Sequence, residues 1–132
     1  MDPHITIITL GVSDLKRSTE FYEKGLGLPK RPDGEGIAFF ELKGTWLALF
    51  QRAELAADAK QPAEGSGFRG FTLAHNVGNK AEVDALLSVA EKVGAKIIKP
   101  AADTDWGGYS GYFADPDGFF WEGAWNPFIT FE

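Results

Sequence analysis

One carboxylate in an apolar stretch is the first candidate for chemistry in this sequence. Glu122 stands in the run FFWEGAW at 119–125, where the alternation of a β-strand places it on one face with Phe120 and Ala124. A carboxylate on an apolar face must be ion-paired, hydrogen-bonded, bound to a cation or kept neutral by a raised pKa. Glu122 is therefore a candidate general base or cation partner, and the alternative is a structural carboxylate bonded to Thr72 or to a water molecule.

A tight turn positions Glu122. The sequence DPDG at 115–118 favours a turn because Pro restricts φ, Asp hydrogen-bonds nearby backbone and Gly accepts a positive φ. Strands on both sides of this turn make 109–125 a predicted hairpin. Before it we expect a strand at 70–77, a helix that begins at a capping box on Asn79 and stops at Gly94, and a strand at 95–99 that Pro100 ends.

The first half of the chain predicts the same order of elements: strand, helix, short edge strand and hairpin. We expect the strand at 5–12, and a helix that is capped by Ser13 or Asp14 and ends at Leu26. The short edge strand is expected at 29–34, and the hairpin is formed by 37–42 and 45–51. The segment 52–68 is poor in apolar residues and predicts a connector.

Spacing supports a repeat between the two halves. The helix caps Asp14 and Asn79 are 79 − 14 = 65 residues apart, and the helix-ending Gly27 and Gly94 are 94 − 27 = 67 apart. A βαβββ unit of this size cannot bury its sheet alone. We therefore expect one α+β domain over 1–132, in which two βαβββ modules form a curved sheet cup with helices outside. Module 1 covers about 1–52, the linker 53–67 and module 2 about 68–128.

Composition excludes several classes of protein. The chain of 132 residues has no cysteine, so disulfides, thiolate metal sites and a cysteine nucleophile are excluded. Its net charge is −6 and its 13 basic residues are scattered, which argues against binding nucleic acid. The N-terminus lacks the basic region of a signal peptide and no segment reaches membrane-spanning length. We expect a cytoplasmic protein that does not bind membranes.

Two motifs and the doubled plan resemble a known family. The runs GVSDLKRSTEFYEKGLGL at 11–28 and DPDGFFWE at 115–122 are similar to those of the vicinal oxygen chelate superfamily. That group includes glyoxalase I, methylmalonyl-CoA epimerase, extradiol dioxygenases, and fosfomycin- and bleomycin-resistance proteins. The resemblance covers essentially the whole chain and implies the fold and a homodimer. It does not fix the reaction.

The resemblance also implies where metal ligands would lie. The corresponding positions are Ile7, Ala48, Thr72 and Glu122, of which only Glu122 has the expected ligand type. One carboxylate and one hydroxyl are too few to hold a divalent metal ion, so we expect no cofactor. The alternative is a divalent metal recruited through His4 or His75. Strand parity points both histidines away from the ligand positions, which favours a structural or surface role.

Three functions remain open. The first is a metal-free binder of a small aromatic or cationic molecule, in a cup at a dimer interface. The second is a metal-independent lyase or isomerase with Glu122 as general base and Thr72, Thr9 or Tyr109 as the donor to an oxyanion. The third is a divalent-metal-dependent enzyme of the glyoxalase or dioxygenase type that uses Glu122 with His75 or His4. The expected ligand-binding residues are Ile7, Thr9, Trp46, Ala48, Phe50, Thr72, Tyr109 and Phe120. Their aromatic side chains either form a clamp around a ligand or pack between the modules.

Overall fold

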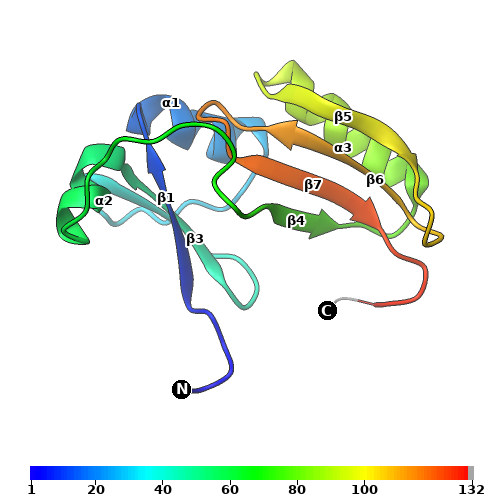
Figure 1. Cartoon of the computed structure of the whole chain (residues 1–132), viewed down its shortest axis with the longest axis horizontal. Helices are drawn as coiled ribbons and strands as arrows, with labels where there is room; N and C mark the ends of the chain where they lie inside the picture. The colour runs from blue at the N-terminus through cyan, green and yellow to red at the C-terminus, as the bar shows by residue number, and fades with distance from the viewer. Residues whose placement is uncertain (131–132) are drawn as a thin grey trace. The chain divides into compact units, whose positions relative to one another are not determined.

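The computed structural model describes residues 1–130, and the chain divides into two compact units, Met1–Ser66 and the residues from Gly67 onward. Each unit contains a β-sheet and helices (Figure 1). The sheets have three and four strands and are accompanied by helices, so the expected α+β class is confirmed. Within residues 1–130, no helix combines the length and apolar character needed to cross a bilayer.

The first unit contains a mixed three-stranded sheet in the order β1-β3-β2, in which β1 and β3 are parallel and β2 and β3 antiparallel. Its elements are β1 (Ile7–Val12), α1 (Leu15–Glu20), the π-helix η1 (Phe21–Gly25), β2 (Ile37–Phe40), β3 (Trp46–Gln51) and α2 (Arg52–Asp58). The side chain of Asp14 caps α1 by accepting from Arg17 N at 3.0 Å. Lys30 forms an isolated bridge with Phe40, so the edge strand expected at 29–34 is reduced to one position.

One face of this sheet carries the core of the unit. Leu10, Leu49 and Phe40 are 1%, 0% and 0% exposed, and α1 contacts β2 and β3. The ring of Tyr22 in η1 lies 6.1 Å from that of Phe40 and is fully buried. The alternation of the strands thus places a continuous apolar layer beneath α1 and η1, and the residues in between face the opposite side of the sheet.

The predicted helix is present from its cap at Asp14: α1 continues as the π-helix η1, whose C-cap is Leu26. One expectation for the first unit is wrong. The segment after β3 is not only a connector, since Arg52–Asp58 forms α2. Its sequence RAELAAD is rich in strong helix formers, and the side chain of Leu55 approaches the Gly11 position to 3.3 Å. Low apolar content therefore concealed a short helix that contacts both β1 and β3.

The second unit contains a four-stranded sheet in the order β4-β7-β6-β5. Its elements are β4 (Leu73–Asn76), α3 (Lys80–Lys92), β5 (Lys96–Asp103), β6 (Tyr109–Ala114) and β7 (Phe120–Trp125). The predicted cap is present: Asn79 Oδ1 accepts from Glu82 N at 2.9 Å, and Glu82 Oε2 accepts from Gly78 N at 2.8 Å. Gly94, at φ 110°, follows the end of α3.

Strand β5 differs from the prediction. It continues past Pro100 to Asp103, with shifts of register against β6 between Ile97 and Lys99 and between Lys99 and Ala102. Because β5 is an edge strand, Pro100 can lie in it without breaking a backbone hydrogen bond that the sheet requires. The register shifts against β6 accommodate the proline. Proline was therefore a poor signal for the end of this strand.

Candidate functional site

Helix α3 covers one face of the second sheet. A Cβ atom added to Gly111 would lie 2.7 Å from Leu87 Cδ2, and one added to Gly123 would lie 2.9 Å from Leu86 Cδ2. Both glycine positions therefore face α3, and the residues next to them in each strand face the opposite side of the sheet. We call this other side the Glu122 face, which consists of Ala74, Asn76, Ser110, Tyr112, Ala114, Phe120, Glu122 and Ala124.

Glu122 is half-buried and lies opposite Tyr112 in the β6–β7 ladder. Burial, then the negative charge of Glu122, then a hydrogen bond between the two side chains raise the pKa of Tyr112 above its ordinary value of 10.0. The phenol is therefore protonated at neutral pH, and it faces the carboxylate across the ladder. Glu122 thus lies opposite a neutral polar side chain rather than a cation.

The sequence reasoning missed Tyr112, although a signal for it existed. The turn holds its register through Asp115 N, which donates to Phe119 O at 2.9 Å, and through the buried Asp115 carboxylate, which accepts from Phe119 N at 2.8 Å. Counting outward from this pair places residue 112 opposite Glu122. The turn sequence therefore limits the partner of Glu122 to residues near 112, and the observed register selects Tyr112.

Tyr109 does not belong to the Glu122 face. Its ladder partner is Trp125, and its hydroxyl donates to Asp84 Oδ1 of α3 at 2.6 Å. Tyr109 and Glu122 have opposite orientations in the hairpin, so this geometry does not support the role beside Glu122 that was expected for Tyr109. The hydrogen bond to Asp84 is also the largest cause that raises the pKa of Tyr109.

The remaining candidates of the second unit are distributed as follows. Phe120 lies on the Glu122 face, and its ring stacks on that of Phe68 with centroids 6.1 Å apart. Thr72 is exposed and precedes β4 by one residue. His75 pairs with Gly123 and so lies on the α3 side of the sheet, as strand parity predicts. The Glu122 face thus combines a carboxylate, a phenol and a stacked aromatic pair.

The first unit brings its predicted residues onto one face as well. We call it the Trp46 face, and its ladder partners are Ile7 with Trp46, Thr9 with Ala48, Gly11 with Phe50, Phe39 with Ala48, and Ile37 with Phe50. Ala48 is fully buried, whereas Ile7 is 39% exposed. Period-2 alternation was therefore sufficient to group these side chains.

Two residues of the Trp46 side escaped the sequence reasoning. Phe39 meets the indole of Trp46 edge-on, with centroids 6.4 Å apart, and the guanidinium carbon of Arg31 lies 5.1 Å from the centroid of the same indole. Arg31 stands in the irregular segment before β2, where alternation gives no information about direction. The Trp46 face is thus an aromatic surface with a cation already stacked on it.

The donor atoms do not fit a resident metal ion. At the positions that correspond to ligands in metal-dependent members, Ile7 and Ala48 have no donor atom in their side chains. The Glu122 face offers one carboxylate with a phenol, the Ser110 hydroxyl and the Asn76 amide, which is a poor set for zinc or iron. In the part of the chain that the structure describes, no three His, Asp or Glu side chains form a group that could hold a metal ion.

Two cavities of the second unit lie apart from Glu122. One of about 330 Å³ lies at the carboxyl ends of β4 and β7 and is lined by residues that include Asn76, Trp125 and Asn126. The other, of about 320 Å³, lies between α3 and β5 and is lined by residues that include Asp84, Leu87 and Glu91. Neither is lined by Glu122, the carboxylate that the sequence singled out, so these two cavities are not the candidate site.

Comparisons with known proteins agree on the family. Residues 3–122 match the sequence model of the glyoxalase/bleomycin resistance protein/dioxygenase superfamily. Among curated proteins, the chain is 29% identical over 121 residues to metallothiol transferase FosB of Shouchella clausii, covering 89% of this chain and 77% of that protein. It is 32% identical over 116 residues to YraH of Bacillus subtilis, covering 83% and 88%.

Solved structures give the same picture. A glyoxalase-related enzyme from Fulvimarina pelagi superimposes with a TM-score of 0.85 at 35% identity, over 95% of this chain and 89% of the other. A lactoylglutathione lyase from Agrobacterium tumefaciens superimposes with a TM-score of 0.74 at 27% identity, over 100% of both chains.

Proposed function

The chain belongs to the glyoxalase/bleomycin resistance protein/dioxygenase superfamily, and from that premise we propose that it binds a small organic cation on the Glu122 face without a metal ion. The observation that carries the proposal is the Tyr112–Glu122 pair beside the stacked rings of Phe120 and Phe68. Organic ammonium groups bind both to carboxylates and to the faces of aromatic rings. A charged carboxylate held by a neutral phenol supplies the first, and the rings supply the second.

Matched ligands test this proposal. The protein is titrated with pairs of aromatic compounds that differ only in whether they carry an ammonium group, and we expect the cationic member of a pair to bind more tightly. Glu122→Gln should remove this preference at a cost of about 1.5–3 kcal/mol, which is typical of a charged hydrogen bond. Added chelator should change neither result, because the donor set does not require a metal ion.

The matched control is Asp84→Asn, which removes one carboxylate from the other side of the same sheet. This variant should retain the preference for cations. Equal binding of both members of every pair by the wild-type protein would contradict the proposal, as would an unchanged preference in Glu122→Gln. Loss of binding on addition of chelator would instead favour a metal-dependent member of the family.

A second candidate function is a metal-independent lyase or isomerase. The Tyr112 hydroxyl next to Glu122 supports it, and so do the enzyme names of two relatives, metallothiol transferase and lactoylglutathione lyase. Here the Glu122 carboxylate would take a proton from a carbon next to a carbonyl group, and the electron pair would move to the carbonyl oxygen. Tyr112 would then donate its hydrogen bond to that oxygen, in the role that the sequence assigned to Thr72, Thr9 or Tyr109.

Exchange in D₂O distinguishes catalysis from binding. Deuterium that enters the carbon next to the carbonyl of a test ketone or thioester, in the presence of chelator, would support the enzyme. The incorporation should be lost in Glu122→Gln and strongly slowed in Tyr112→Phe. Binding without exchange across such compounds supports the binder.

A further inference from the structure

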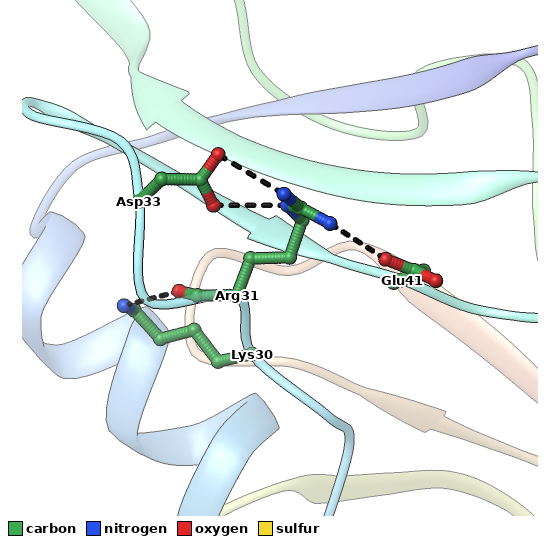
Figure 2. Close-up of polar contacts among 4 residues, drawn as sticks. All are labelled: Lys30, Arg31, Asp33 and Glu41. Carbon is green, nitrogen blue, oxygen red and sulfur yellow. Dashed lines mark hydrogen bonds and ion pairs between the residues drawn. The ribbon is translucent and has the colours of Figure 1, made fainter.

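The guanidinium of Arg31 is held by two carboxylates in the first unit. Figure 2 shows Arg31 between Asp33 and Glu41, with the Lys30 ammonium on the carbonyl oxygen of Arg31. Arg31 Nε and Nη2 donate to the two oxygens of Asp33 at 2.9 and 3.3 Å, and Nη1 donates to Glu41 Oε1 at 2.7 Å. The hydrogen bond with Arg31 is the largest cause that lowers the pKa of Asp33. Both carboxylates are thus charged partners of a single cation.

The same guanidinium lies over the indole of Trp46, 5.1 Å from its centroid. The backbone explains how this geometry arises: Arg31 N donates to Phe39 O at 2.8 Å, which fixes Arg31 beside β2, and Glu41 directly follows β2. Trp46 is the first residue of β3, the strand that pairs with β2. An indole face flanked by two carboxylates is the set of groups that binds organic cations, and here the chain supplies the cation itself.

Stability alone does not explain this arrangement. The side chains of Arg31, Asp33 and Glu41 are 37%, 60% and 55% exposed, and ion pairs between exposed side chains contribute little to stability. We therefore expect the unit to fold without the Arg31 guanidinium, which makes a substitution at this position a usable test. Because Arg31 already covers this indole face and pairs with both carboxylates, a second cation would have to displace it to use the same groups.

We infer that Asp33, Glu41 and Trp46 form an organic-cation site that Arg31 of the same chain occupies, so that Arg31 determines the charge selectivity of the Trp46 face. With Arg31 in place, this face accepts uncharged aromatic compounds and rejects ammonium compounds. Removing the guanidinium converts it into a cation site. This inference goes beyond the function proposed above, because it concerns the other unit and does not require Glu122 to bind anything.

The probe for the test is tetramethylammonium chloride, titrated at constant ionic strength while the indole N–H resonances are followed by NMR. The Trp46 resonance is assigned as the one missing in Trp46→Phe. In the wild-type protein we expect no saturable shift of this resonance. In Arg31→Gln we expect a saturable shift, with a dissociation constant at least about fivefold below any limit seen for the wild type.

Three further variants make the result specific. Arg69→Gln removes the arginine that lies 4.5 Å over the ring of Phe119 in the other unit, and should leave the Trp46 resonance as insensitive as in the wild type. Glu41→Gln added to Arg31→Gln should weaken the new binding. Arg31→Lys keeps the charge without the planar fork and should still exclude the probe, so it tests the inference even if Arg31→Gln does not fold.

A saturable shift of Trp46 in the wild-type protein would overturn the inference, as would the absence of any shift in folded Arg31→Gln. The function proposed for Glu122 can fail independently of this inference. In that case the wild-type protein would show no preference for the cationic member of a ligand pair, while the Trp46 titrations would still give their expected results.

Discussion

Two side chains from neighbouring strands decide what the second unit can offer to a ligand. Glu122 supplies the charge, and Tyr112 supplies a donor that satisfies part of the carboxylate without neutralising it. A lysine in place of Tyr112 would form an ion pair and cancel the charge. The choice of a phenol therefore keeps a half-buried carboxylate hydrogen-bonded while its negative charge stays available.

This pair predicts how stability depends on pH. The pKa of Tyr112 is raised in the folded protein, so the folded state keeps this proton to a higher pH than the unfolded state does. The resulting contribution to the free energy of unfolding is complete below about pH 10 and is lost as the pH rises from there through the folded-state pKa. Urea unfolding from pH 8 to 11.5 should show a smaller alkaline loss of stability in Tyr112→Phe than in the wild type.

Part of the alkaline loss should persist in Tyr112→Phe, because the pKa of Tyr109 is also raised, mainly by its hydrogen bond to Asp84. Glu122→Gln should reduce the loss as well, since it removes the charge next to the phenol. Identical pH profiles for the wild type and Tyr112→Phe would show that the two side chains do not interact in solution.

At the scale of elements, the packing of α3 on the β6–β7 hairpin depends on two paired glycines. A Cβ atom at position 111 would lie 2.8 Å from both Ala101 N and Lys99 O, which are backbone atoms of β5, besides its contact with Leu87. At position 123 the nearest atoms, at 2.9 Å, belong only to the side chains of Leu86 and Leu87. The helix can approach the sheet this closely because neither position has a side chain.

Replacing each glycine by alanine should therefore have unequal effects. Gly111→Ala should destabilise the protein by about 1–3 kcal/mol or more, because backbone atoms cannot rotate away, and Gly123→Ala should cost less. Chemical denaturation of both variants measures the difference. Leu86→Ala combined with Gly123→Ala should recover part of the loss caused by the new methyl group, and equal costs at the two positions would contradict this account of the packing.

At the scale of the whole molecule, we propose that the protein is a homodimer, as the family resemblance implied. Large apolar side chains are exposed in the second unit, among them Trp106 at 47%, Phe128 at 74% and Ile129 at 55%. A second copy of the chain is the occupant that would cover such residues in a protein of this family. Light scattering at micromolar concentration should give twice the chain mass of 14.4 kDa.

The dimer prediction can be checked with one variant. Phe128→Ser should shift the equilibrium toward the monomer if this patch takes part in the interface, while Phe68→Ser tests an exposed ring next to the Glu122 face instead. A monomeric wild type would rule out the dimer and leave the exposed side chains without a partner.

Local chemistry made much of the fold predictable. The turn at 115–118, the cap at Asn79 and the alternation of β1, β3 and β7 each depend on residues close together in the chain, and each is present. The errors occurred where a contact outweighed the local signal. Helix α2 packs on β1 and β3 although its own sequence has few large apolar residues, and β5 continues through Pro100 because an edge strand tolerates proline.

The sequence by itself determined that Glu122 lies in an apolar strand and that Ile7, Thr9, Trp46, Ala48 and Phe50 share one face, because strand alternation is a property of the backbone alone. Only the tertiary structure decided their partners. The ladder register placed Tyr112 opposite Glu122 and turned Tyr109 toward Asp84, and an irregular segment laid Arg31 on Trp46. Such pairings join residues of different elements, so no periodicity within one element could reveal them.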